Sequence, residues 1–239
     1  NYNNSGTFMS YNKGSLTLGS TNSTGSYFTS WTRKNNQFSN MVLGSTDDAN
    51  ISSMSMISPT SVVLGNINGL DMNNAVTGSW YEVTDITTDD TGSKSNSIVV
   101  PGYSMGRQAG DKFGTDVNYI PGIISVTAPN NGYTETGGAL TTNGALYTFY
   151  VPTGSSDNKF IYEDKLYNTG SLSTTYQRIS GYGNSLLVGG SSGISLFNRT
   201  RIGSWNLINN VPGSTIEGFS LSSGNRFSYG TPASFTDGK

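Results

Sequence analysis

The feature that most constrains this sequence is its division into short, strand-like runs by glycine, proline and asparagine. Residues 111–151 show it best, because DKFGTDV, IISVTAP and GALYTFYV are rich in β-branched and aromatic residues and are separated by turn residues. No apolar pattern with helical spacing persists for three turns, and strong helix formers are scarce. The sequence therefore predicts an all-β chain with almost no helix.

The same order of pieces recurs along the chain. A first apolar run is followed by a second run that begins with glycine, and these second-run glycines are spaced by roughly fifty to sixty-five residues, near the period of propeller blades. One unit of this kind cannot bury its apolar face alone, so several must stack. About four or five units are expected. The runs are 15–19 with 25–31, 61–65 with 78–83, 123–129 with 144–149, 185–189 with 193–197, and a partial unit at 226–232.

The best of these units resembles a known repeat. Phe113-Gly114, then an apolar run that ends in Ala128-Pro129, then 144–149 is similar to an FG-GAP repeat, the blade unit of integrin-type β-propellers. The resemblance implies an all-β, propeller-like fold with about four or five irregular blades. A β-sandwich or another antiparallel architecture remains the alternative, because strand order cannot be read from one sequence.

The length of the chain and its first residue set the expected domain organisation. A chain of 239 residues can bury a core as one all-β domain, so a single repeat domain over 1–239 is predicted. Because the chain begins with Asn rather than Met, we expect a processed chain or a fragment of a longer one. No apolar run approaches the roughly eighteen residues of a membrane span, and none is predicted.

Charge and chemistry exclude several function classes. The formal net charge is −2 and the basic residues are scattered singly, which disfavours nucleic acid as a partner. The chain contains no Cys and no His, so thiol chemistry and the commonest general base are absent. Asp111 and Asp116 are the candidates if the protein degrades a polysaccharide, but no carboxylates stand in a glycosidase context, and Glu163-Asp164 is interpreted as a solvated turn. An enzyme is not expected.

One loop carries a metal hypothesis. Calcium loops place side-chain oxygens at alternating positions around a glycine, and integrin-type blades have an Asp-rich loop of this kind. Here the oxygens would come from Asn66, Asn68 and Asp71, with Gly69 at the turn. Only one of the three is charged, so an Asn-Gly hairpin turn is the preferred interpretation and calcium the alternative. No other cofactor is predicted.

Aromatic residues in loops suggest a ligand. Sugar rings stack on aromatic faces and their hydroxyls pair with amides, so Tyr or Trp beside Asn, Gly or Ser is typical of a glycan-binding surface. The candidates are Tyr103, Tyr119, Tyr133, Tyr182 and Trp205. The alternative for any of them is a place in the core between sheets.

The composition resembles that of phage tail and virion proteins, with few charges and much Gly, Ser, Thr and Asn. We expect a structural or host-attachment component of a virus particle, located in the virion and part of an oligomer or larger assembly. Its loops would face other virion proteins or host glycans. The alternatives are a carbohydrate-binding lectin or adhesin at the cell surface or outside the cell and, less favoured, the polysaccharide-degrading enzyme.

Overall fold

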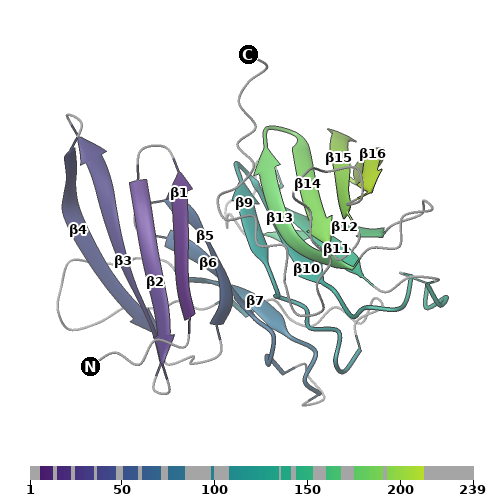
Figure 1. Cartoon of the computed structure of the whole chain (residues 1–239), viewed down its shortest axis with the longest axis horizontal. Helices are drawn as coiled ribbons and strands as arrows, with labels where there is room; N and C mark the ends of the chain where they lie inside the picture. The colour runs from purple at the N-terminus through teal and green to yellow at the C-terminus, as the bar shows by residue number, and fades with distance from the viewer. Residues whose placement is uncertain are drawn as a thin grey trace.

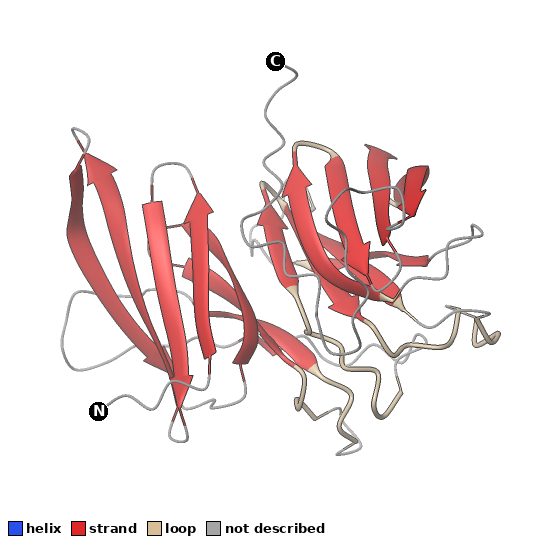
Figure 2. Ribbon diagram, viewed as in Figure 1, coloured by secondary structure: helices blue, strands red, loops and turns tan. Residues whose placement is uncertain are grey.

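The computed structural model describes residues 6–12, 15–22, 25–34, 37–46, 51–58, 61–70, 75–83, 98–99, 108–134, 136–140, 144–152, 160–167, 175–190 and 193–212. Within these ranges the chain forms strands, turns and connecting segments and no helix (Figure 2). The prediction of an all-β chain is therefore confirmed for the described part.

The described strands form four antiparallel sheets of four strands each, and in every sheet the strands lie side by side in chain order. Sheet I contains β1 (Gly6–Asn12), β2 (Ser15–Asn22), β3 (Gly25–Lys34) and β4 (Gln37–Thr46). Sheet II contains β5 (Ile51–Ser58), β6 (Ser61–Asn66), β7 (Ser79–Val83) and β8 (Ile98–Val99). Sheet III contains β9 (Val117–Ile120), β10 (Ile123–Ala128), β11 (Ala145–Tyr150) and β12 (Ile161–Tyr167). Sheet IV contains β13 (Tyr176–Tyr182), β14 (Ser185–Gly190), β15 (Gly193–Arg201) and β16 (Ser204–Pro212).

The repeated pairs of runs in the sequence are the two middle strands of each sheet. They correspond to β2 with β3, β6 with β7, β10 with β11, and β14 with β15, each an antiparallel pair. The partial unit at 226–232 lies outside the described residues. Four of the predicted pairs of runs are thus confirmed as antiparallel strand pairs, each in the middle of a four-stranded sheet.

The sheets follow one another through their first strands. β1 contacts β5, β5 contacts β9, and β9 contacts β13, so neighbours in the chain are neighbours in space. In Figure 1 sheet I lies at one end of this series and sheet IV at the other. The described part of the chain contains no closed sheet and no closed propeller ring.

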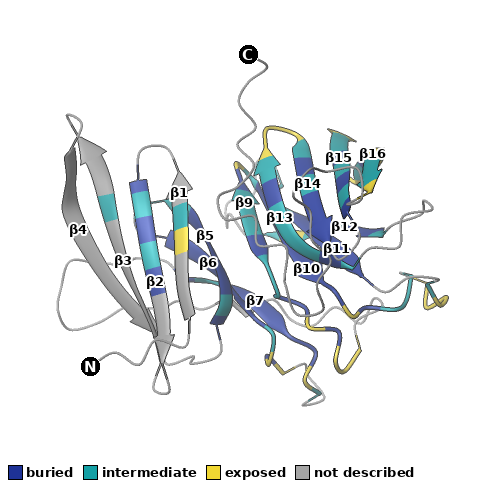
Figure 3. Ribbon diagram, in the orientation of Figure 1, coloured by how far each residue is buried: buried dark blue, intermediate teal, exposed yellow. Residues whose placement is uncertain are grey.

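The core lies in the middle of the series. β6 and β10 are buried along their whole length, because sheets II and III have a neighbour on each side. β14 and β15 alternate between buried and half-buried positions, as expected for a sheet with one covered face (Figure 3). One cluster joins sheets II and III around Trp80, Phe113 and Phe149, and a second joins sheets III and IV around Tyr176 and Phe197.

Candidate functional site

The predicted calcium loop is a hydrogen-bonded turn at the end of β6. The side-chain Oδ1 of Asn66 accepts the backbone N–H of Asn68 at 2.8 Å, and the Gly69 N–H donates to the Asn66 carbonyl at 3.3 Å. Such an Asx turn stabilises the chain reversal without a metal. Asn66 is buried, Asn68 is exposed, and Asp71 lies outside the described residues. Among the described residues no three acidic side chains are grouped to hold a metal ion.

The predicted glycan-binding aromatics lie in different parts of the structure. Tyr182 ends β13 and is 56% exposed, whereas Trp205 of β16 is only 8% exposed. Tyr119 and Tyr133 are half-buried, and Tyr103 lies outside the described residues. Tyr182 is thus the described candidate with the most open ring.

Tyr119 and Tyr182 face different neighbours. The Tyr119 ring packs against the cluster between sheets II and III and meets Phe160 edge-on at 6.4 Å. Gly181, next to Tyr182, lies against Asn118 and Ile120, which flank Tyr119 on β9 and point to the opposite face of that strand. The two tyrosines therefore do not form one stacking surface.

Tyr133 lies in the connection between β10 and β11. Its N–H donates to Asn131 Oδ1 at 3.3 Å, and its carbonyl accepts the Nζ of the buried Lys165 at 2.5 Å. Both backbone groups of Tyr133 are thus tied to the fold, which fixes the position of its half-buried ring.

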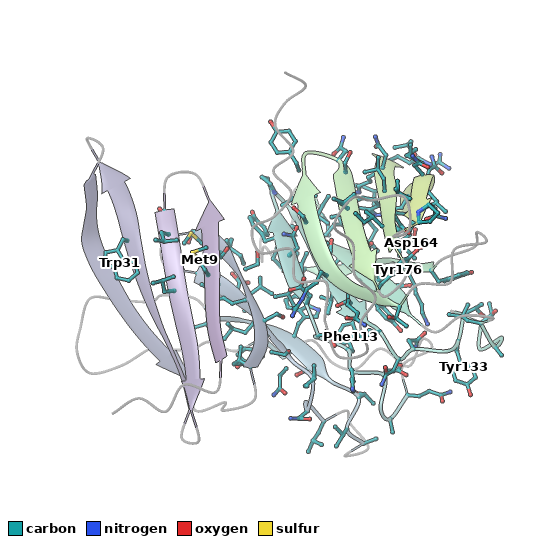
Figure 4. All side chains as sticks on the ribbon, in the orientation of Figure 1. Met9, Trp31, Phe113, Tyr133, Asp164 and Tyr176 are labelled. Atoms are coloured by element: carbon teal, nitrogen blue, oxygen red, sulfur yellow. The ribbon has the colours of Figure 1, made fainter. Side chains whose placement is uncertain are left out.

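The Phe113-Gly114 pair, on which the FG-GAP resemblance rests, joins sheet II to sheet III. The Phe113 ring packs edge-on against Tyr147 at 5.0 Å, and it is buried at the centre of the molecule (Figure 4). The Gly114 carbonyl accepts the hydroxyls of Ser52 at 2.6 Å and Ser53 at 3.2 Å from β5. Gly114 has φ of 92°, and a Cβ there would lie 2.3 Å from the Ser79 carbonyl oxygen. Only glycine fits this junction.

Asp111, a candidate catalytic carboxylate, is buried beneath a turn. Its Oδ2 accepts the backbone N–H of Gln108 at 2.7 Å and the side-chain amide of Asn131 at 2.6 Å. Oδ2 therefore accepts donors from the two segments that flank β9 and β10. A carboxylate held in this way orders the connections between strands.

Asp116, the second candidate, binds the next sheet. Its Oδ2 accepts the backbone N–H of Ile179 on β13 at 2.8 Å, and its Oδ1 lies 3.8 Å from Arg178 Nη1. Burial raises the pKa of Asp116 to about 6, against the lowering effects of Arg178 and of the backbone hydrogen bonds from Ile179 and Val117.

Glu163 also joins two sheets, and the prediction that it lies in a solvated turn is wrong. It stands in β12, its side chain is 0% exposed, and it binds three groups of the β15–β16 hairpin. Oε1 accepts Arg199 Nε at 2.6 Å and the Gly203 N–H at 2.9 Å, and Oε2 accepts the indole N–H of Trp205 at 3.1 Å. Trp205 thus serves the contact between sheets III and IV and presents no open ring face.

Three of the described acidic side chains therefore stabilise the fold. Asp111, Asp116 and Glu163 each bind donors supplied by the chain itself. Sequence reasoning missed the joints at Asp116 and Glu163, because their partners lie 63 and 36 residues further along the chain.

Comparisons with known proteins leave the family open. No protein-family model matches the chain, and no curated protein matches it. Across the described residues, no helix has the length and apolarity to cross a bilayer.

Proposed function

We propose that the chain is a structural or host-attachment component of a virus particle, with its sheets arranged as blades of an open, propeller-like series. Its role is passive: a rigid framework presents loops to neighbouring subunits or to host glycans. The FG-GAP resemblance and the blade-like order of four strands in each sheet support this architecture.

One observation carries the proposal: a polar joint links each sheet to the next. The Met56 N–H of β5 donates to Ser10 Oγ of β1 at 2.9 Å, and the Tyr119 N–H of β9 donates to Ser55 Oγ of β5 at 2.9 Å. Asp116 and Ile179 form the third joint. Because buried hydrogen bonds fix register as well as adding stability, these joints favour a rigid presenting scaffold.

The surface supports the same role. Charged residues are 12% of the chain, so contacts with neighbours would be made by hydroxyls, amides and apolar groups. Such contacts depend little on salt, which suits a particle that meets varied media.

The test is the assembly state of the native material, by size-exclusion chromatography with light scattering and a peptide map. We expect the chain in a megadalton particle together with other particle proteins. A free monomer of 25.4 kDa as the native form would overturn the virion proposal.

A lectin or adhesin is the second candidate, because the turn after β13 exposes Tyr182, Gly183 and Asn184 together. An aromatic ring beside an amide is what a sugar needs for stacking and hydrogen bonding. On a glycan array, Tyr182→Ala would abolish binding while Ile202→Ala, a change at another exposed turn residue, would leave it intact. No glycan binding by the wild type would reject this candidate.

A further inference from the structure

Among the described strands, no neighbouring sheet packs on one face of each end sheet. Sheets II and III have a neighbouring sheet on both sides, whereas sheet I contacts only sheet II and sheet IV contacts only sheet III through their main strand contacts. The side chains on those two open faces indicate whether each face is ordinary solvated surface or a site of contact with another molecule. Both carry apolar side chains.

Three small polar residues, Ser10, Ser15 and Thr17, identify the face of sheet I that is turned toward sheet II. Ser15 and Thr17 of β2 are buried at 2% and 0% exposure on the side where Ser10 joins β5. Strand pairing places Ser10 opposite Thr17, so these small polar side chains share the face toward sheet II.

The opposite face of sheet I is apolar and open. Met9 pairs with Leu18, and Leu16 pairs with Trp31, so the four side chains share the face turned away from sheet II. Met9 is 62% exposed, and the other three are half-buried. Figure 4 labels Met9 on β1 and Trp31 on β3, the strands on either side of β2.

Sheet IV has a similar open face. Leu186, Val188 and Phe197 are buried against sheet III. On the other side Leu187 pairs with Leu196, and Ile194 pairs with Val211, and all four are half-buried. No described strand covers this row of aliphatic side chains, and an exposed apolar row of this kind is typical of an interaction surface.

We infer that the open face of sheet IV in one copy packs on the open face of sheet I in the next copy, so that the chain associates head to tail. We favour a second copy of the chain as the partner, because this contact would continue the existing arrangement. Within the chain, each four-stranded sheet already packs on the next. The two open faces are apolar in the same way, so each supplies the partner that the other lacks. The inference does not depend on the virion proposal.

The area of the two open faces sets the expected strength of association between copies. Four strands about 4.8 Å apart and about eight residues long, at about 3.3 Å per residue, present roughly 500 Å². Two such faces bury about 1,000 Å², near the lower limit for a specific interface, so association should depend on concentration. Because the interface joins two different faces, it leaves a free face at each end and can extend into rings or filaments.

The test measures the mass of the full chain by sedimentation velocity over a wide range of protein concentration. Wild type is expected to rise from 25.4 kDa to larger species as concentration increases. Leu18→Lys on sheet I and Leu196→Lys on sheet IV should each weaken association at least tenfold. The controls Leu70→Lys and Ile202→Lys, at positions 54% and 53% exposed outside both faces, should leave it unchanged.

Mixing the two interface variants identifies the geometry. The Leu18→Lys chain keeps a working sheet IV, and the Leu196→Lys chain keeps a working sheet I, so the mixture should form one-to-one dimers and nothing larger. The milder pair Leu18→Ser and Leu196→Ser repeats the measurement, and unchanged thermal unfolding shows that the variants are folded.

Several results would overturn the inference. Wild type could stay monomeric at all concentrations, or the controls could weaken association as much as the interface variants. Continued self-association of the Leu18→Lys chain alone would mean that sheet IV pairs with itself. If wild type is a monomer and Leu196→Lys lowers its stability without changing its mass, the two open faces contact each other within one chain.

Discussion

The carboxylate of Asp116 and the backbone N–H of Ile179 are joined across two sheets by a 2.8 Å hydrogen bond. Ser10 with Met56 and Ser55 with Tyr119 repeat the arrangement at 2.9 Å in the two preceding junctions. In each case a side-chain oxygen of one unit accepts an N–H from the first strand of the next. The series of sheets is thus held by polar joints as well as by the apolar clusters between sheets II and III and between sheets III and IV.

Replacement of Asp116 tests the joint between sheets III and IV. Asp116→Ala leaves the Ile179 N–H without its acceptor, and we expect it to lower the free energy of unfolding by about 1–3 kcal/mol. Asp116→Asn keeps an acceptor oxygen and should be at least as stable as wild type at neutral pH. Urea unfolding of the three proteins measures this, and equal stability of the Ala and Asn variants would contradict the proposed joint.

The raised pKa of Asp116 predicts a pH dependence with a definite sign. Its folded-state pKa of about 6 lies above the unfolded value of 3.8, so the folded protein binds the proton more tightly. Stability relative to Asp116→Asn should therefore be greatest below about pH 4, fall by on the order of 2–3 kcal/mol as pH rises through the folded pKa to about 7, and then stay level. Unfolding of both proteins at a series of pH values gives the difference directly. A difference that grows with pH would contradict burial as the dominant cause.

Gly114 and Gly122 form a matched pair for the Phe-Gly junction. Both have positive φ, 92° and 79°, but a Cβ at Gly122 has nothing within 4 Å, whereas one at Gly114 lies 2.3 Å from the Ser79 oxygen. Gly122→Ala should cost about 1–2 kcal/mol from backbone strain alone. Gly114→Ala should cost more than about 4 kcal/mol, because sheets II and III must move apart. Thermal unfolding compares them, and similar costs would show that the junction is not closely packed.

The middle strands of sheets II and III were predictable from sequence because they are buried on both faces. β6 and β10 read as continuous apolar or small-residue runs between turn residues, a local signal. β16, in contrast, carries five asparagine, proline and serine residues among its apolar ones and lies at an edge, so its pattern resembles a loop. Its existence depends on pairing with β15.

The hydrogen bonds between sheets were not predictable, because each of them joins residues that are far apart in the sequence. Glu163 beside Asp164 and Lys165 has the composition of a turn, and nothing local indicates that Arg199 and Trp205 will enclose it. The sequence also suggests a ligand-binding role for Trp205, because a tryptophan beside an asparagine fits a sugar site or a buried contact equally well. Tertiary packing decides between the two.

Removal of divalent cations tests the Asn66 turn. Since Asn66 Oδ1 already accepts the Asn68 N–H, we expect EDTA and added Ca²⁺ to leave the melting temperature of wild type unchanged. Asn66→Ala should lower stability by about 1 kcal/mol in either condition, because the turn loses its side-chain hydrogen bond. A calcium-dependent rise in melting temperature that Asn66→Ala abolishes would instead establish the cation site.

The buried Glu163–Arg199 pair gives the sharpest test of the contact between sheets III and IV. Glu163 is fully buried and Arg199 is 15% exposed, so removing one charge leaves the other without compensation in a poorly solvated place. We therefore expect Glu163→Ala and Arg199→Ala each to lower the free energy of unfolding by about 3–5 kcal/mol. Arg201→Ala, at an exposed position of the same strand, should change it by less than about 0.5 kcal/mol.

The double variant Glu163→Ala/Arg199→Ala separates the pair from its surroundings. If the cost comes from an orphaned charge, the double variant should lose less than the sum of the single variants, since no uncompensated charge remains. Trp205→Phe removes only the indole donor to Glu163 and should cost about 1.5–3 kcal/mol, as a hydrogen bond to a charged group does. Additive losses in the double variant would show that the two residues act independently.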